Sequence, residues 1–226
     1  MLRILVISMW LVTTGVAWAA GAENISNTEA ATGLKQALTD GSAAAVAQLG
    51  RQDGFLANPK VKIPLPPALQ RVESALRYTG LRKQADELVV TMNRAAEAAV
   101  PEARPLLVNA VRNMSLKDAK GILTGGDTAA TDYFRRATQT DLTQRFLPIV
   151  KKTTDQVGLA EQYNGLAGQL LQLGLIKKEQ STIEAYVTQK ALDGLYLMIG
   201  EQEKSFRQNP LGATSDIVKR IFSSTR

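Results

Sequence analysis

Apolar residues recur along most of the chain at the three- and four-residue spacing of a helix that buries one face. Between residues 34 and 49 the apolar positions share one helical face, and Gly41 lies among them. Gly41 therefore marks either the close approach of another helix or a break in this one. No stretch alternates in the manner of a strand over more than about five residues. The pattern predicts a single all-α domain of about eight helices over residues 28–226.

Two segments begin with a sequence typical of a capping box, in which a side chain three residues further on bonds back to the cap. Ser115 has Asp118 in that position, and Ser181 has Glu184. Both are expected to start a helix, and the helix after Ser181 is long. Other residues that can cap the start of a helix are Asp127, Thr140 and either Thr214 or Ser215.

Residues 51–67 interrupt the helices, because four prolines in this segment forbid helical structure. Val61, Ile63 and Leu65 alternate with polar or proline positions. No other segment offers itself as a strand partner. We therefore expect an extended strap, with alternate side chains inserted into the domain, and we call residues 51–67 the strap.

The N-terminus has the pattern of a secretory signal peptide. A basic start at Arg3 precedes an apolar stretch over residues 4–16, and an Ala-Trp-Ala cleavage sequence follows. The stretch is shorter than the ~20 residues of a membrane-spanning helix, although an uncleaved anchor or a buried core helix would be alternatives. We expect residues 1–19 to be removed after Ala19, residues 20–27 to be flexible, and the mature chain to be periplasmic and without a transmembrane segment.

Composition excludes several kinds of chemistry. The chain has no cysteine and no histidine, so it lacks thiolate and imidazole nucleophiles, the usual zinc ligands, disulfides and a lipid-accepting cysteine. The net charge of +6 is spread along the chain in pairs of basic residues, and aromatic residues make up 5%. Nucleic-acid binding is therefore disfavoured, and no cofactor or metal is expected.

A polar block interrupts one predicted helix. Asn93 and Glu97 share a helical face, and Arg94 and Glu97 are within pairing reach. These side chains could grip a polar ligand, or they could tie the helix to a neighbour or to the strap. The second interpretation is favoured, because such pairs are common on helices.

A Gly-Gly turn at residues 125–128 could cradle an anion at a helix N-terminus. It lacks the spaced glycines and the lysine of a phosphate-binding loop, and Asp127 would repel phosphate. Asp127 is better suited to cap the following helix. The turn is therefore expected to be structural.

Carboxylates offer two further hypotheses. Asp118, Asp127 and Asp132 could form an oxygen-rich cation site if the turn brings them together, but they lack the EF-hand spacing. Glu97 with Asp118 or Asp127 could form the acid pair of a glycosidase acting on a cell-wall polymer.

Charged residues near the end of the long C-terminal helix form pairs three and four positions apart. Their default interpretation is a solvated face. The residues are Glu201, Glu203, Lys204 and Arg207.

Several blocks resemble the family known as domain of unknown function 4197, exported helical proteins of Gram-negative bacteria. The resemblance covers nearly the whole mature chain and implies the same fold and export, but no activity. The blocks are residues 33–38, the strap sequence at 60–66, residues 92–97, Asp118-Ala119, residues 125–131, 186–188 and 190–195.

We expect a non-enzymatic periplasmic binding or interaction protein of the cell envelope, whose partner is an envelope protein or a small ligand. The alternatives are the carboxylate-based hydrolase and a carrier of a hydrophobic ligand. A site, if present, is expected where the helix of residues 93–97 meets the Gly-Gly turn. Its candidate residues are Asn93, Arg94, Glu97, Asp118, Asp127 and Thr131.

Overall fold

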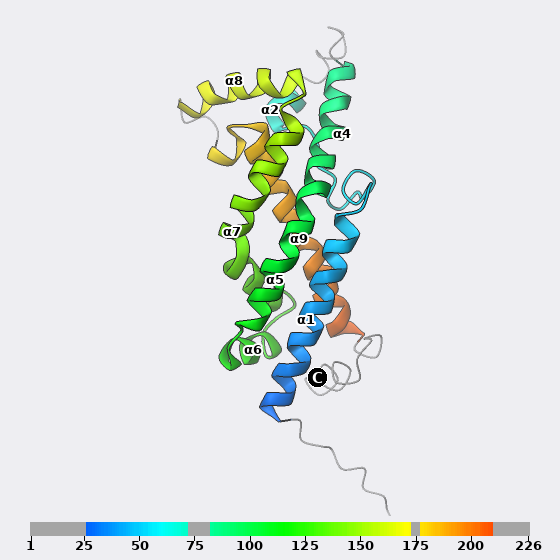
Figure 1. The fold of residues 1–226 in the computed structure, drawn as a ribbon, viewed down its shortest axis with the longest axis vertical. Helices are drawn as coiled ribbons and strands as arrows, with labels where there is room; N and C mark the ends of the chain where they lie inside the picture. The colour runs from blue at the N-terminus through cyan, green and yellow to red at the C-terminus, as the bar shows by residue number, and fades with distance from the viewer. Residues whose placement is uncertain (1–25, 72–81, 173–176, 210–226) are drawn as a thin grey trace, which may run out of the picture.

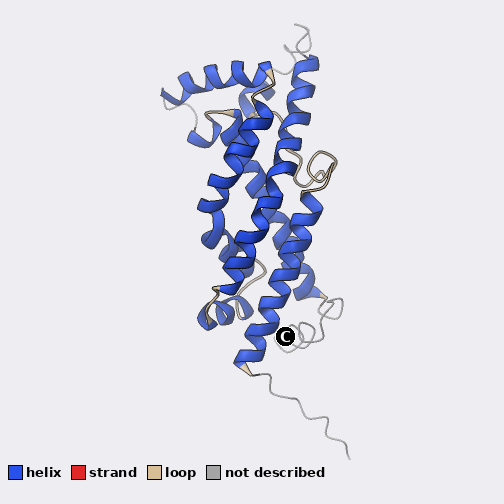
Figure 2. Cartoon of the chain, viewed as in Figure 1, coloured by secondary structure: helices blue, strands red, loops and turns tan. Residues whose placement is uncertain are grey.

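The computed structural model describes residues 26–71, 82–172 and 177–209, and these residues form helices and turns without a strand (Figure 2). The all-α class predicted from the sequence is confirmed. The expected signal peptide and the helix expected after Thr214 or Ser215 lie outside the described residues. No helix in the described parts of the chain is both long and apolar enough to cross a membrane.

Four long helices form the body of the molecule and run along its length (Figure 1). Their inward faces supply much of the core, including the fully buried Leu34, Met92, Phe146 and Leu195. Helix α9 packs against α1, α4 and α7, and so it is the central helix of the bundle. The four helices are α1 (Asn27–Leu49), α4 (Arg82–Ala99), α7 (Ala129–Thr154) and α9 (Ile183–Gln208).

Shorter helices close the two ends of this bundle. Helices α5 and α6 pack against α1 and α7 at one end, and α8 lies crosswise at the other (Figure 1). The short elements are α2 (Pro67–Arg71), η1 (Val100–Glu102), α5 (Ala103–Arg112), α6 (Leu116–Leu123), α8 (Gly158–Gln172) and η2 (Lys178–Gln180).

The predicted capping box at the start of α6 is confirmed. The Ser115 hydroxyl accepts a hydrogen bond from the Asp118 backbone N–H at 3.1 Å, and the Asp118 carboxylate accepts one from the Ser115 N–H. Helix α1 has a second capping box, which was not predicted from the sequence, between Ser26 and Glu29. Its Ser-x-x-Glu spacing was a readable signal.

The predicted capping box at Ser181 is wrong by one residue. Thr182 caps α9 and accepts a hydrogen bond from the Ala185 N–H at 3.1 Å. The Ser181 hydroxyl instead donates to the carbonyl of Lys178 in the preceding 3-10 turn. Glu184 is thereby free to accept from the Asn164 amide of α8, so a tertiary contact takes the place of the local one.

The prediction that Asp127 and Thr140 start separate helices is also wrong. One continuous helix, α7, begins after Thr128 and passes through both Thr140 and Pro148. Its buried positions recur every four residues from Phe134 to Thr154, so a single face continues through the predicted boundary. Packing against α4 and α9 along this face outweighs the local cost of an interior proline.

Gly41 marks a helix crossing and not a break. A Cβ atom at this position would lie 3.0 Å from Phe206 Cε2 of α9, and α1 is continuous through it. The absence of a side chain therefore permits the close approach of α1 and α9, which is one of the two interpretations of the sequence.

The strap has two parts. Its first part folds as consecutive turns, which we call the strap loop (residues 51–60), and its second part is extended until α2 begins. Val61, Ile63 and Leu65 are buried while the residues between them are exposed, as the alternation predicted. The extended part is held by side chains and not by a neighbouring strand.

Candidate functional site

The polar block of α4 attaches this helix to the strap. Asn93 is fully buried, and its Oδ1 accepts a hydrogen bond from the Ile63 N–H at 2.8 Å. Its Nδ2 donates to the Ile63 carbonyl at 2.8 Å and to the Val89 carbonyl at 2.7 Å. The carboxamide thus pairs with the strap backbone in the way that a neighbouring strand would, and it satisfies polar groups that would be costly to bury alone.

Glu97, one turn further along α4, holds the strap loop. Its Oε1 accepts hydrogen bonds from the Phe55 N–H at 3.0 Å and from the Leu56 N–H at 3.1 Å. Its Oε2 accepts from Arg94 Nη1 at 2.6 Å. The carboxylate is nearly inaccessible, and both of its oxygens serve to fix the turn.

Arg94 connects Glu97 of α4 to the strap loop. Besides Glu97, its guanidinium donates to Asp53 Oδ1 of the strap loop at 2.8 Å. The hydrogen bonds to Glu97 and then to Asp53 raise the pKa of Arg94 above its ordinary value. The network of Arg94, Glu97 and Asp53 is the tie between helix and strap that the sequence favoured over a ligand grip.

The strap loop is tightly built. Asp53 has a φ of 64°, a left-handed conformation that is uncommon outside glycine. A Cβ at Gly54 would lie 2.4 Å from the Leu49 carbonyl oxygen, so only glycine fits there. The Phe55 ring is fully buried against Gly194 of α9, where a Cβ would come within 2.8 Å of Phe55 Cε1. The loop is therefore anchored on two helices.

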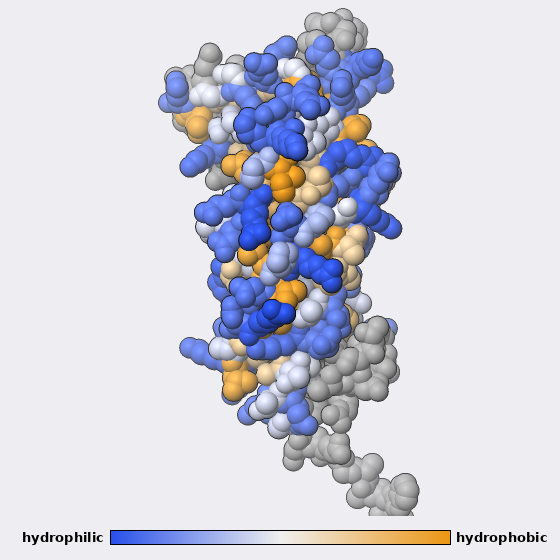
Figure 3. All heavy atoms as spheres, in the orientation of Figure 1, coloured by the Kyte–Doolittle hydropathy of each residue, from blue (hydrophilic) through white to orange (hydrophobic). Residues whose placement is uncertain are grey.

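The outer side of the strap loop borders an open groove of about 610 Å³ between the loop and α9. On the right of the view, at the height of the strap loop, the surface is mostly hydrophilic with some hydrophobic residues among the polar ones (Figure 3). The groove is lined by Gln48, Arg51, Gln52, Asp53, Gly54, Ala57, Asn58, Pro59, Lys60 and Met198. We call it the strap groove.

A second, more apolar groove of about 680 Å³ lies between α4 and α7. Ala98, Pro148 and Ile149 form its apolar part, and Lys152 lies at its edge. Neither groove was foreseen from the sequence, because each is made by residues from segments that are distant along the chain.

The remaining candidate residues belong to the other end of the bundle. Asp118 completes the capping box that Ser115 starts at α6, and the hydrogen bond from the Ser115 hydroxyl lowers the pKa of the Asp118 carboxyl. Asp127 is exposed and does not cap α7, because Thr128 occupies that position. The Thr128 hydroxyl donates to Asp132 at 3.1 Å. Within the described ranges no three acidic residues are grouped as a metal site.

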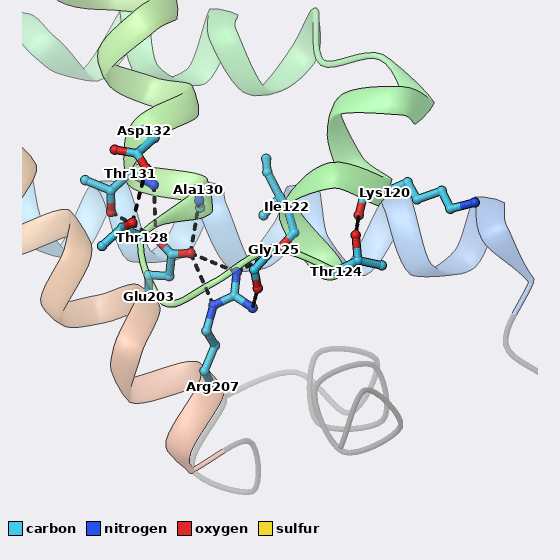
Figure 4. Close-up of polar contacts among 10 residues, drawn as sticks. All are labelled: Lys120, Ile122, Thr124, Gly125, Thr128, Ala130, Thr131, Asp132, Glu203 and Arg207. Carbon is cyan, nitrogen blue, oxygen red and sulfur yellow. Dashed lines mark hydrogen bonds and ion pairs between the residues drawn. The ribbon is translucent and has the colours of Figure 1, made fainter.

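Thr131 is held by Glu203, a residue that the sequence had predicted to be on a solvated face. Glu203 of α9 accepts from the Ala130 N–H at 3.0 Å with Oε1, and from the Thr131 N–H and hydroxyl at 3.0 and 2.9 Å with Oε2. Figure 4 shows this carboxylate pointing at the first turn of α7. Glu203 therefore caps α7 from another helix, which is why Asp127 is not needed for this role.

Arg207 also contacts Glu203, and we call the two side chains together the Glu203 clamp. It donates to Glu203 Oε1 at 2.8 Å and to the Ile122 carbonyl at 2.8 Å, and it reaches the Gly125 carbonyl at 3.4 Å (Figure 4). The Glu203 and Arg207 side chains are only 3% and 14% exposed, so the predicted solvated face is wrong for this pair. The missed signal was the position of Glu203, one turn after the buried Ile199 on the core face of α9.

The two sets of candidate residues do not meet. Pro148 and Ile149 of α7 share a groove with Ala98, the neighbour of Glu97. Thr131 precedes Pro148 by 17 residues on α7, or about 25 Å at 1.5 Å per residue. The structure therefore does not form the expected site where α4 meets the Gly-Gly turn, and it does not pair Glu97 with Asp118 or Asp127.

The architecture defines an all-helical protein in which one surface loop is braced from inside by buried polar side chains. The chain belongs to the family described as Protein of unknown function (DUF4197), whose model matches residues 24–223. No curated protein and no solved structure matches the chain. The blocks that carried the family resemblance include the braces of the strap and the turn held by Glu203.

Proposed function

We propose that this protein is a non-enzymatic binding protein of the bacterial cell envelope, and that its partner occupies the strap groove. The observation that carries the proposal is the construction of the strap loop. Two buried anchors, Glu97 and Phe55, fix an exposed loop that contains a left-handed aspartate and borders a groove. Strained and rigidly held surface loops are characteristic of binding sites.

The use of the polar residues favours binding over catalysis. Glu97 and Asn93 are saturated by contacts to the strap, and Glu203 by contacts to α7 and Arg207. A general acid or a nucleophile needs an accessible atom that a substrate can reach. These buried carboxylates offer no accessible atom, because their oxygens accept hydrogen bonds from backbone N–H groups and from arginines.

Export to the periplasm is part of this proposal. It rests on the basic start, the short apolar stretch and the small residues that precede Ala20. Mass spectrometry of the protein from an envelope fraction should find Ala20 as the first residue. An intact Met1 in that fraction would indicate an uncleaved anchor.

A carrier of hydrophobic ligands is the second candidate, and the apolar groove between α4 and α7 is the observation that favours it. A carrier encloses most of its ligand surface. Binding of a fluorescent fatty acid tests this candidate. If Ile149→Asp abolishes this binding and Arg51→Gln leaves it unchanged, the carrier is favoured over a partner in the strap groove.

Site-specific photo-cross-linking tests the proposed binding surface. A photoreactive amino acid replaces Gln52 in the strap groove, and in a matched protein it replaces Arg104, an exposed residue on α5. Illumination of intact cells should give a discrete adduct from position 52 and none from position 104. Equal adducts from both positions, or none from position 52, would remove the support for the strap groove.

A further inference from the structure

We infer that the strap groove recognises a short peptide through a free carboxylate, with Arg51 as the anchor. This inference rests on the proposed function and adds the chemical class of the ligand. It is carried by the charges, the carboxamides and the size of the groove.

The acidic groups beside the groove already have cationic partners. Asp53 is paired with Arg94 at 2.8 Å, and Glu201 contacts Lys60. The hydrogen bond from Lys60 lowers the pKa of the Glu201 carboxyl, which keeps this carboxylate ionised. Arg51 is exposed and has no acidic partner within the part of the chain that the structure describes. The net preference of the groove is therefore for an anion.

The planar guanidinium of Arg51 favours a carboxylate as the bound anion. A guanidinium is planar and presents parallel N–H groups that match the two oxygens of a carboxylate. Because Arg51 lies at the start of the braced strap loop, its backbone is held in place by the turn that Glu97 fixes. A pre-positioned arginine loses less freedom on binding than one on a mobile loop.

Three carboxamides in the same groove indicate what accompanies the carboxylate. Gln48, Gln52 and Asn58 each combine a donor and an acceptor in one side chain, as a peptide bond does. Asn58 accepts from the Lys60 N–H with Oδ1 at 3.1 Å, which leaves its NH₂ group as the part of the side chain that can donate to a ligand. A phosphomonoester is mostly a dianion at neutral pH and then only accepts, so it would leave the amide oxygens of Gln48 and Gln52 without a donor. Among the described residues, the lining has no aromatic side chain on which a sugar ring could stack.

The remaining lining suits small side chains. Ala57, Pro59 and Met198 provide apolar surface, and methionine adapts its shape to different neighbours. The volume of about 610 Å³ is in the range of small-ligand sites. The groove therefore fits a few peptide residues with short side chains and not a folded protein surface.

Two labelled peptide pools test this inference on the protein purified from its own envelope. One pool contains fluorescein-labelled random tetrapeptides with a free C-terminal carboxylate, and the other contains the same peptides as C-terminal amides. Fluorescence anisotropy should show at least about tenfold tighter binding of the carboxylate pool, as expected for a charge-assisted bidentate contact. Arg51→Gln should abolish this preference, while Arg104→Gln, on an exposed arginine elsewhere, should retain it.

Equal affinity for the two pools, binding of neither pool, or an unchanged preference in Arg51→Gln would overturn the inference. Competition by inorganic phosphate as effective as by acetate would also overturn it, because the site would then recognise any anion. Melting curves of both arginine variants are the control that a lost preference is not caused by unfolding. If the adduct at position 52 forms while neither peptide pool binds, the ligand class is wrong and the proposed function stands.

Discussion

The Glu97 carboxylate of α4 accepts a hydrogen bond from the backbone N–H of Phe55 at 3.0 Å, across 42 positions of sequence. A side chain of one helix thus fixes the backbone of a surface loop, and the Phe55 ring packs against Gly194 of a second helix, α9. The loop is held between two helices, which makes it a rigid support for the strap groove.

Removal of this carboxylate should destabilise the protein. Glu97→Ala deprives the N–H groups of Phe55 and Leu56 of their acceptor and Arg94 of one partner. We expect the free energy of unfolding to fall by about 2–4 kcal/mol, and by about 1 kcal/mol for Glu97→Gln, which keeps an acceptor. Urea denaturation measures both values.

Glu87→Ala is the matched control for this prediction, because it removes an exposed glutamate from the same helix. It should change the free energy of unfolding by no more than about 0.5 kcal/mol. Equal effects of the two alanine variants would mean that Glu97 does not brace the loop.

Peptidoglycan zymography with wild type and Glu97→Gln tests the alternative of a hydrolase. Clearing by the wild type that is lost in Glu97→Gln would support the hydrolase.

The Glu203 clamp should control the start of α7. Glu203→Ala removes the acceptor of the Ala130 and Thr131 N–H groups and the carboxylate that Arg207 contacts. The free energy of unfolding should fall by about 2–4 kcal/mol, and the first amides of α7 should exchange faster with deuterium. Lys204→Ala, on the exposed side of the same turn, should change neither the free energy of unfolding nor the exchange of these amides. Unchanged exchange in Glu203→Ala would contradict the clamp.

Gly194 should not tolerate a methyl group. A Cβ there would lie 2.8 Å from Phe55 Cε1 and 3.2 Å from Val61 Cβ, so Gly194→Ala must displace the strap. We expect a loss of about 1–3 kcal/mol in the free energy of unfolding. Gly165→Ala in α8, where an added Cβ would meet no described atom within 4 Å beyond its own stretch of helix backbone, should be neutral or stabilising by up to about 1 kcal/mol. A Gly194→Ala protein as stable as wild type would show that Phe55 does not pack there.

Tyr186 should make the strap sensitive to alkali. Its buried hydroxyl donates to the Pro64 carbonyl at 3.2 Å, and burial raises its pKa from 10.0 to about 12. Because the folded-state pKa is the higher one, the stabilisation is complete below pH 10.0 and is lost as pH rises towards about 12.

Tyr186→Phe removes both the hydrogen bond and the titration. At pH 7 this variant should be less stable than wild type by about 1 kcal/mol, and the gap should narrow between pH 10 and 12. Melting temperatures across this range measure the gap. A gap that widens with pH would show that the sign assigned to the Tyr186 pKa is wrong.

The sequence predicted what depends on local spacing. Helical periodicity, the capping box at Ser115 and the alternation of Val61, Ile63 and Leu65 all lie within a few residues, and the structure confirms them. The tie between Asn93 and the strap was foreseen as a favoured interpretation. Its particular partner, the Ile63 backbone, required the fold.

The errors arose where a distant residue replaced a local one. Glu203 took the capping role assigned to Asp127, and Asn164 took the Glu184 side chain from Ser181. In both cases a tertiary contact satisfies the helix end, and sequence spacing cannot show such a partner. The grooves were missed for the same reason, since each joins segments that are far apart along the chain.

If α4 braces the strap loop so that a partner can bind at it, loss of the brace should weaken binding. The most direct measurement compares the photo-cross-link from position 52 in wild type, Glu97→Ala and Glu87→Ala, at a temperature where all three are folded. We predict a strong adduct in wild type and Glu87→Ala, and a yield at least about tenfold lower in Glu97→Ala, because an unbraced loop loses more conformational entropy when it is ordered on binding. An undiminished adduct in folded Glu97→Ala would contradict this prediction.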